Sequence, residues 1–455
     1  QFTKSSTDKV FILKGYAGTG KTTLMSGFIK WLNDKEELYA QLASTGRAAK
    51  VLRDKTGEKA YTIHSTIYVF SDLDDDLEAM AATQNEFVVD DKGQISLVFE
   101  VRVIKSDRKR IYIIDEASMV SDITGTTTSF AKFGTGKLLR DLFAFDPNGK
   151  FVFVGDPVQL PPVGQQISPA LSKEYIENKY NFRVKQYELT DIIRQDTESS
   201  IIKASFLLRK QHATNLQVKF ATFKFNGFQD VKVHNSHVNL VNEYISIVKE
   251  HGFDHTTLIC QTNRHCADLN RIIRAAFGKN ENQLEKGDIL MVTQNNYIAN
   301  LVNGDIVEVV ATGKRELRCG LNFLNVQVKE IGGTKIHNIL LIEDILYSVS
   351  TNLDNKQHKD LMIDYYFRMK DLGIKQKSQL FKDRMFFDPY LNALKAVYGY
   401  ALTCHKAQGG EWNEVFLYID NKIHGIPKPG IYQWMYTAVT RAKKKLHIVN
   451  DWFIK

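Results

Sequence analysis

The sequence lacks several features that would place it among membrane, metal-binding or repetitive proteins. No apolar run approaches the ~20 residues that a membrane-spanning helix requires, and we see no internal repeats or low-complexity tracts. The cysteines are few: Cys260, Cys266, Cys319 and Cys404. They form no C-x-x-C pair and no paired cysteine and histidine spacing. This pattern favours reduced, buried thiols over a metal site or a disulfide framework.

What is present is the composition of a globular protein. The 455 residues are too many for one ordinary core and predict two to four domains. Hydrophobic residues make up 43% of the chain and charged residues 25%. The net charge of +8 is compatible with a polyanionic partner, although a mildly basic surface also serves solubility. Because the sequence begins at Gln1 without methionine, we interpret its N-terminus as trimmed or partial.

A phosphate-binding loop is the clearest motif. An apolar run at 10–13 is followed by GYAGTGKT at 15–22, and then by apolar residues at helical spacing. The glycines let the backbone N–H groups turn inward, where the positive end of the helix dipole adds to them. Lys21 is expected to reach the β- and γ-phosphates, and the Thr22 hydroxyl to bind Mg²⁺. We therefore predict binding of a nucleoside triphosphate, with these cofactor-binding residues: Gly15, Gly18, Thr19, Gly20, Lys21, Thr22 and Thr23.

Two sets of buried parallel strands are predicted. IYIIDE at 111–116 and FVFVGD at 151–156 are apolar runs that end in acidic residues, which is typical of strands in a doubly wound α/β domain. Similar runs begin at Thr256, Val397, Glu414 and Lys445 and predict a second α/β domain. Each domain carries an insertion with short alternating strands: a β-hairpin in the first and a small β-barrel in the second.

Candidate catalytic residues lie at the ends of these predicted strands. Asp115 is placed to hold Mg²⁺, and Glu116 to orient and deprotonate the attacking water. Gln159, held between prolines in GDPVQLPPV, suits a sensor of the γ-phosphate, although an ordinary turn explains the same pattern. Arg194 and Arg441 could stabilise the charge of the transition state, whereas a single such arginine is more often a salt-bridge partner.

Polar and basic residues at other predicted strand ends are suited to gripping a phosphodiester backbone without reading bases. They occur in STGRAAK (44–50), TIHST (62–66), QTNR (261–264) and TCHKAQGGEW (403–412). His64 and His405 could equally be core histidines. Aromatic residues of the inserted hairpin, among them Phe87 and Phe99, could stack on bases, but core packing is the simpler interpretation.

In order and spacing, these motifs resemble those of superfamily 1 helicases of the 5′→3′ branch, the RecD and Pif type, and the chain is also similar to the phage Dda helicase. The resemblance extends from about Lys9 to Asn450 and ends in the arginine motif YTAVTRAK. It implies two RecA-like domains with ATP between them and single-stranded DNA across both. Adenine preference rests on the family alone, because the chain starts too close to the phosphate loop to show the family's upstream glutamine motif.

The resemblance also implies a division of the chain. The first RecA-like domain takes residues 1–67 and 104–195, with an inserted pin domain at 68–103. The second takes 196–302 and 396–455, with an inserted SH3-like domain at 303–395.

Family motifs that contact the DNA backbone fall on Thr45, Arg47, His64, Asn263, Thr403, His405 and Lys406. We also assign Gly409 and Glu411 to the nucleotide site.

The resulting hypothesis is an ATP- and Mg²⁺-dependent DNA helicase that moves 5′→3′ on single-stranded DNA, a polarity inherited from the family. The expected partners are single-stranded DNA, junctions of single and double strands, and proteins of replication, repair or recombination, with the enzyme a monomer. We expect a cytoplasmic enzyme in a bacterial or phage-infected cell, or a nuclear or mitochondrial one in a eukaryote. Two alternatives remain open: an RNA translocase of the same architecture, and a nucleotide-switched DNA-binding or recombination subunit that does not unwind.

Overall fold

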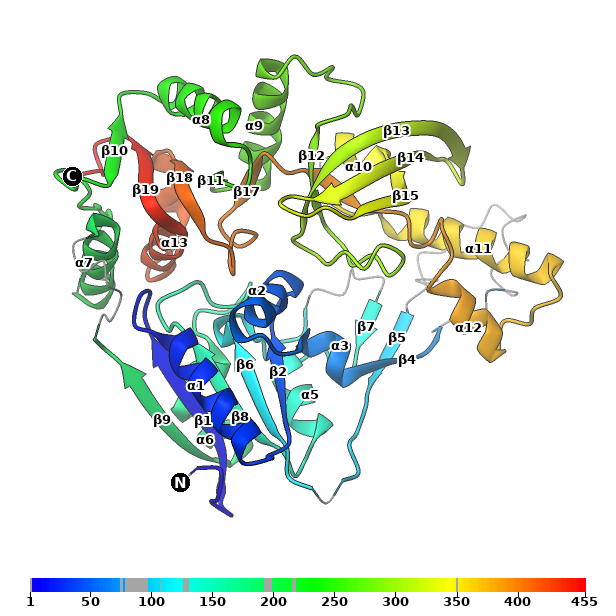
Figure 1. Ribbon diagram of the computed structural model, residues 1–455, viewed down its shortest axis with the longest axis horizontal. Helices are drawn as coiled ribbons and strands as arrows, with labels where there is room; N and C mark the ends of the chain where they lie inside the picture. Colours follow the sequence, from blue (N-terminus) through cyan, green and yellow to red (C-terminus); the bar gives the residue numbers. More distant parts are fainter. Residues whose placement is uncertain are drawn as a thin grey trace.

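The computed structural model describes residues 2–73, 77, 97–106, 108–125, 131–191, 199–214, 218–348 and 351–455. These residues form two parallel sheets, one antiparallel five-stranded sheet and one three-stranded sheet, with helices packed around them (Figure 1). None of the helices in the described residues combines the length and the hydrophobicity that a membrane-spanning helix needs. The mixed α/β class with parallel sheets is therefore confirmed.

The first parallel sheet has six strands and carries the phosphate loop. Its order is β3 (Ala60–Thr62), β2 (Tyr39–Ala43), β6 (Ile111–Asp115), β8 (Lys150–Gly155), β1 (Asp8–Gly15) and β9 (Arg183–Leu189). Helices α1 (Lys21–Asp34) and α2 (Gly46–Thr56) pack on one face, and α3 (Ile63–Ile67), α5 (Leu138–Phe145) and α6 (Lys173–Tyr180) on the other.

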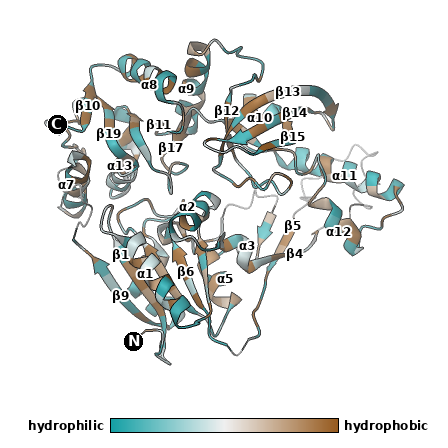
Figure 2. Ribbon diagram, in the orientation of Figure 1, coloured by the Kyte–Doolittle hydropathy of each residue, from teal (hydrophilic) through white to brown (hydrophobic). Residues whose placement is uncertain are grey.

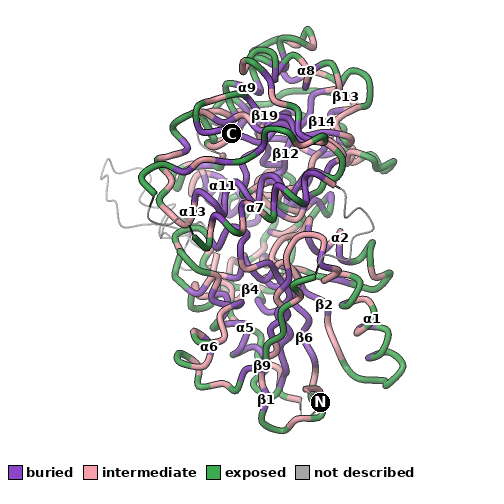
Figure 3. Tube along the Cα trace, turned by 90° about the vertical axis from the view of Figure 1, so that its left-hand side faces the viewer, coloured by how far each residue is buried: buried purple, intermediate pink, exposed green. Residues whose placement is uncertain are grey.

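Hydrophobic side chains on both faces of its central strands hold this sheet in place. Val10 and Ile12 of β1 are fully buried on the α5 side, whereas Leu13 packs on the α1 side. Figure 2 shows hydrophobic residues along β1 and β6, and Figure 3 shows that these strands are buried. Since both faces are covered, these strands read as continuous apolar runs in the sequence.

The second parallel sheet has five strands and lies in the upper left of Figure 1. Its order is β10 (Val231–His234), β19 (Ala442–Val449), β18 (Trp412–Tyr418), β11 (Thr256–Cys260) and β17 (Ala401–Thr403). Helices α8 (His237–His251) and α9 (Asn263–Ala276) cover one face, and α7 (Ser200–Thr214) and α13 (Gly430–Val439) the other.

An antiparallel sheet interrupts the second parallel sheet in the chain. Its order is β15 (Ile336–Ile342), β14 (Leu321–Glu330), β13 (Ile306–Arg318), β12 (Ile289–Val292) and β16 (Ala396–Tyr398). Helices α10 (Asp344–Tyr347), α11 (Asn355–Asp371) and α12 (Gln379–Met385) follow β15. The apolar run that begins at Val397 is thus divided: its first residues pair antiparallel with β12, and β17 pairs parallel with β11.

A three-stranded sheet lies beside α11 and α12 on the right of Figure 1. It consists of β4 (Tyr68–Leu73), β5 (Leu97–Val101) and β7 (Ala131–Phe133). β4 and β5 pair antiparallel, and β7 joins β5 in parallel. Most of the predicted hairpin between β4 and β5, including Phe87, lies outside the described residues.

Short 3₁₀ helices complete the described structure: η1 (Ala117–Met119), η2 (Pro169–Leu171) and η3 (Asn421–Gly425).

Candidate nucleotide site and nucleic-acid contacts

The loop between β1 and α1 has the geometry of a phosphate cradle. Gly18 and Gly20 have φ of 78° and 79°, a left-handed conformation that favours glycine. A Cβ on Gly15 would lie 2.7 Å from Thr19 Oγ1, so the loop closes too tightly for a side chain there. No side chain caps the first turn of α1, which leaves its N–H groups available to an anion.

Side chains of the loop are folded inward around one carbonyl. Thr19 Oγ1 and Lys21 Nζ donate to the carbonyl oxygen of Tyr16 at 2.9 and 2.8 Å. Thr22 is half-buried and Thr23 is exposed. The Lys21 side chain thus crosses the loop. Its ammonium can bind a phosphate by giving up its hydrogen bond to the neutral Tyr16 carbonyl.

Asp115 and Glu116 lie at the carboxyl end of β6, as the sequence predicts. Burial raises the pKa of Asp115, and the positive charge of Lys21 opposes that rise. Burial and the charge of Asp115 raise the pKa of Glu116, against the charges of Arg441 and Lys21. Lys21, Asp115, Glu116 and Arg441 come from three separate segments of the chain. Their charges therefore act on one another in one site.

Gln159 is almost completely buried, and its Oε1 has no hydrogen-bond partner among the described residues. Its backbone N–H donates to the Asp156 carbonyl at 3.3 Å, which fixes the turn after β8. A buried acceptor without a donor is costly. An ordered water or a ligand group would satisfy it.

Arg441 follows α13 and is 5% exposed. It donates to the carbonyls of Thr437 and Gly410 and to Thr440 Oγ1, at 3.0, 3.3 and 3.2 Å. It forms no ion pair with a carboxylate within the part of the chain that the structure describes. Its charge is therefore available to an anion between the two parallel sheets. Arg194, its predicted counterpart, lies outside the described residues.

Hydrogen bonds join the two parallel sheets around this site. The Ala17 N–H of the phosphate loop donates to the Tyr436 hydroxyl at 3.0 Å. The Leu160 N–H donates to Thr437 Oγ1 at 2.9 Å, and Gln408 Nε2 to the Leu160 carbonyl at 3.3 Å. The loop and turn of the first sheet thus bond directly to segments of the second.

Gly409 and Glu411, both predicted to bind nucleotide, lie in the connection before β18. Gly409 has φ of 75°, and a Cβ there would lie 3.4 Å from Ala48 Cβ, so this segment packs against α2. The Glu411 carboxylate lies 3.9 Å from Lys443 Nζ.

The residues predicted to contact DNA fall into two groups. Four are engaged or buried within the protein. The Thr45 hydroxyl caps α2, the Arg47 guanidinium stacks on Trp412 at 4.4 Å, and His64 packs against Phe133. Burial lowers the pKa of Arg47 to about 10 and also lowers that of His64. Thr403 is buried at the end of β17.

The other three predicted contacts are accessible. Asn263 at the start of α9 and His405 after β17 are exposed, and Lys406 is half-buried. They follow the neighbouring strands β11 and β17, so their side chains belong to the same sheet edge. This edge has the polar and cationic groups that a sugar-phosphate backbone requires.

Sequence reasoning missed several residues of the site. Arg209 of α7 lies 3.2 Å over the Tyr16 ring, and the Tyr436 hydroxyl donates to Asp156 Oδ2 at 2.7 Å. Tyr16 and Tyr436 stand inside recognised motifs, which could have marked them. Nothing in the sequence around Arg209 distinguishes it.

Fold and site together define a P-loop NTPase with two parallel α/β sheets. Two family models match the chain: an AAA domain over residues 2–223 and a UvrD-like helicase C-terminal domain over residues 398–449. They cover the phosphate loop and the segment of Arg441, respectively.

Curated relatives extend over nearly the whole chain. The RecD subunit of the RecBCD enzyme of Buchnera aphidicola is 24% identical over 98% of this chain and 72% of its own. The ATP-dependent DNA helicase Pif1 of Campylobacter jejuni is 26% identical over 91% and 83%. The ATP-dependent DNA helicase dda of phage T4 is 24% identical over 95% and 92%. The resemblance to superfamily 1 helicases of the RecD and Pif type, and to Dda, is thus confirmed.

Among solved structures, a Bacteroides Pif1 helicase in complex with ADP-AlF3 and single-stranded DNA is similar, with 17% identity and a TM-score of 0.47. The match covers 100% of this chain and 90% of that one.

Proposed function

We propose that this chain is an ATP-dependent DNA helicase that translocates 5′→3′ on single-stranded DNA. The observation that carries the proposal is the charged cluster of Lys21, Asp115, Glu116 and Arg441, which lies where the two parallel sheets meet. A triphosphate bound there would contact both halves of the molecule, one built on the first parallel sheet and the other on the second. Hydrolysis would then change how the halves are held together, which is what a translocating motor requires.

The domain assignment supports this mechanism. We propose that residues 1–67 with 104–195, and 196–302 with 396–455, are the two RecA-like domains, and that 68–103 and 303–395 are a pin and an SH3-like insertion. The antiparallel sheet supports the second insertion and suggests wider limits, because it begins with β12 and ends with β16.

Each polar group of the cluster has a distinct chemical role. The loop N–H groups and Lys21 bind the phosphates, and Gln159 senses the γ-phosphate. Glu116 orients the attacking water and accepts its proton, which is reasonable because its raised pKa makes it a stronger base. Arg441, and Arg194 by family resemblance, stabilise the charge that develops on the phosphate.

A magnesium ion fits the oxygen donors at this site. The Thr22 hydroxyl and the Asp115 carboxylate are the hard oxygen ligands that Mg²⁺ prefers. The described residues contain no group of three or more acidic, histidine or cysteine side chains that could hold a metal alone. Triphosphate oxygens and water would complete the coordination. When bound, the ion would neutralise phosphate charge.

We further propose that the DNA backbone lies across the edge formed by Asn263, His405 and Lys406. Contacts to the backbone alone suit an enzyme that must move over any sequence. Thr45, Arg47, His64 and Thr403 are proposed to act nearby, by shaping the surface or by contacts made after the halves move. We expect a monomer that works on junctions of single and double strands, together with replication, repair or recombination proteins.

ATP turnover with different polynucleotides tests the proposal. The expected result is steady-state hydrolysis stimulated by poly-dT more than by poly-U, and lost in Lys21→Ala. Equal or greater stimulation by poly-U would favour the RNA translocase. Nucleotide-dependent DNA affinity with little turnover would instead identify a switched DNA-binding subunit.

A further inference from the structure

Tyr436 occupies a central position between the phosphate loop and the turn after β8. It lies on α13, which is part of the second parallel sheet's layer, and it is fully buried. Its hydroxyl accepts from the Ala17 N–H at 3.0 Å and donates to Asp156 Oδ2 at 2.7 Å. One phenolic oxygen therefore bonds to two separate motifs of the first sheet.

The chemistry of the hydroxyl suits both bonds at once. Burial and the nearby charge of Asp156 raise the pKa of Tyr436 well above its usual value. The group therefore stays protonated throughout the physiological range. A phenylalanine would keep the ring packing but lose the donor to Asp156 and the acceptor for Ala17.

Asp156 in turn organises the segment that carries Gln159. Its Oδ1 accepts from the Val158 N–H at 3.0 Å, and its carbonyl accepts from the Gln159 N–H. The turn that carries Gln159 is thus held by the carbonyl and the carboxylate of Asp156, and Tyr436 of α13 bonds to that carboxylate from the other half of the molecule.

The same stretch of α13 also leads to Arg441. The Thr437 hydroxyl accepts from the Leu160 N–H, and the Thr437 carbonyl accepts from Arg441 Nε at 3.0 Å. Two consecutive residues, Tyr436 and Thr437, therefore connect the phosphate loop, the Gln159 turn and Arg441.

We propose that Tyr436 is a positioning residue for hydrolysis: its hydroxyl sets the turn of Gln159 in register with the phosphate loop, beside Thr437, whose carbonyl holds Arg441. The inference rests on the proposed ATPase function. Nucleotide binding and hydrolysis should respond differently to a change at Tyr436. Binding depends on the loop itself, whereas hydrolysis depends on groups brought from both sheets. Loss of the hydroxyl should therefore lower kcat and leave nucleotide affinity nearly unchanged.

The test uses Tyr436→Phe beside Tyr244→Phe in the full chain. Tyr244 is an equally buried tyrosine of α8 whose hydroxyl donates to the Tyr400 carbonyl at 2.7 Å, within the second half of the molecule. It controls for the loss of one buried hydroxyl. We expect Tyr436→Phe to lower the kcat of DNA-stimulated hydrolysis about tenfold or more, since small misplacements of reacting groups carry such costs. Affinity for a fluorescent ADP analogue should stay within about threefold of the wild type, and Tyr244→Phe should keep the wild-type kcat.

Three outcomes would overturn the inference. Equal kcat values for Tyr436→Phe and Tyr244→Phe would overturn the inference and leave the proposed function intact. A fall in ADP affinity that parallels the fall in kcat would assign Tyr436 to binding instead. Absence of DNA-stimulated hydrolysis in the wild type would overturn the proposed function as well.

If Tyr436→Phe does not fold, Asp156→Asn tests the same bond. Asp156 accepts from the Val158 N–H and from Tyr436 on two different carboxylate oxygens, and an asparagine replaces one of these oxygens by an NH2 group, so one of the two acceptor positions is lost. The same selective fall in kcat is expected, and an unchanged kcat would contradict the inference.

Discussion

At the scale of single residues, the two adjacent carboxylates after β6 differ in backbone conformation. Asp115 ends the strand, whereas Glu116 has φ of 49°, a left-handed conformation that is unusual for a residue with a side chain. Such conformations cost about 1–3 kcal/mol and tend to persist where function requires them. The backbone conformation thus changes between Asp115, the proposed metal ligand, and Glu116, the proposed base.

Replacing Glu116 by glutamine should separate these roles. The amide keeps the size of the side chain and some of its hydrogen bonds but cannot accept a proton. We expect kcat for ATP hydrolysis to fall by about 10²–10⁴-fold, the usual contribution of a general base. Nucleotide affinity, measured by equilibrium titration with an ADP analogue, should be retained. A variant with more than a tenth of the wild-type kcat would show that Glu116 is not the base.

At the scale of elements, the sequence predicts the buried strands well and the exposed ones poorly. The runs of β6, β8, β11 and β18 are continuous because helices cover both faces of their sheets. β9 was missed because its residues, RVKQYEL, are mostly exposed at the sheet edge.

The same contrast applies to the site. The phosphate loop and the Asp115–Glu116 pair are local motifs, so the sequence alone could identify them. Arg209 over Tyr16, and the bonds of Tyr436, arise from tertiary packing between segments hundreds of residues apart, which no local pattern records.

Three adjacent strands of the second sheet contribute a buried histidine network. His447 of β19 lies between His234 of β10 and Glu414 of β18, with nitrogen and oxygen atoms 3.0 and 2.8 Å apart. Burial lowers the pKa of His447 to about 4, although Glu414 opposes this effect. The pKa of His234 is also lowered, first by burial. Both imidazoles are therefore neutral in the folded protein at neutral pH.

This network predicts a pH dependence of stability. The unfolded chain binds a proton at His447 near pH 6.5, whereas the folded chain does so only near pH 4. The stabilisation is fully present above pH 6.5 and is lost as the pH falls towards 4. Between pH 7 and 5 the free energy of unfolding should fall by about 2 kcal/mol from this group. Urea unfolding of the wild type and His447→Gln would measure it, and equal pH slopes in the two proteins would contradict the assignment.

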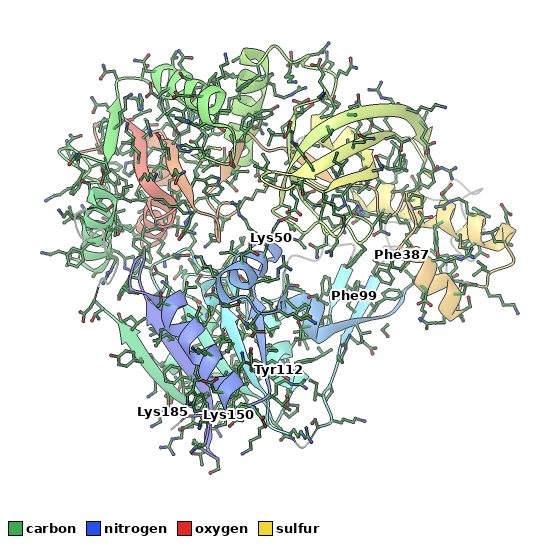
Figure 4. The ribbon with its side chains drawn as sticks, in the orientation of Figure 1. Lys50, Phe99, Tyr112, Lys150, Lys185 and Phe387 are labelled. Carbon is green, nitrogen blue, oxygen red and sulfur yellow. The ribbon has the colours of Figure 1, made fainter. Side chains whose placement is uncertain are left out.

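At the scale of the whole molecule, strand β4 of the three-stranded sheet contacts α12 and the residue after it, although these segments lie far apart in the chain. The ring centroids of Phe70 in β4 and Phe386 after α12 are 5.3 Å apart, and Lys382 Nζ donates to the Ser71 carbonyl at 2.7 Å. The Phe99 ring of β5, labelled in Figure 4, lies 5.6 Å from the Phe70 ring. Lys50 of α2 forms an ion pair with Glu330 of β14, which also joins the first half of the molecule to the antiparallel sheet.

This contact predicts a way to uncouple ATP hydrolysis from strand separation. If the β4–β5 hairpin is the wedge, α12 must hold it against the duplex. Phe386→Ala should lower the unwinding rate several-fold and leave DNA-stimulated ATP hydrolysis within about twofold of the wild type. Leu380→Ala, at a half-exposed position of α12, is the matched control. Parallel loss of both activities in Phe386→Ala would show that this contact supports the whole fold instead.

The central claim is that the halves of the molecule form an ATP-driven motor that unwinds DNA with 5′→3′ polarity. Unwinding of partial duplexes with either a 5′ or a 3′ single-stranded tail, in the presence of ATP and Mg²⁺ and beside Lys21→Ala, tests it most directly. We predict unwinding from the 5′ tail alone, and none by Lys21→Ala. DNA-stimulated ATP hydrolysis without strand separation from either tail, or unwinding from the 3′ tail alone, would contradict the account.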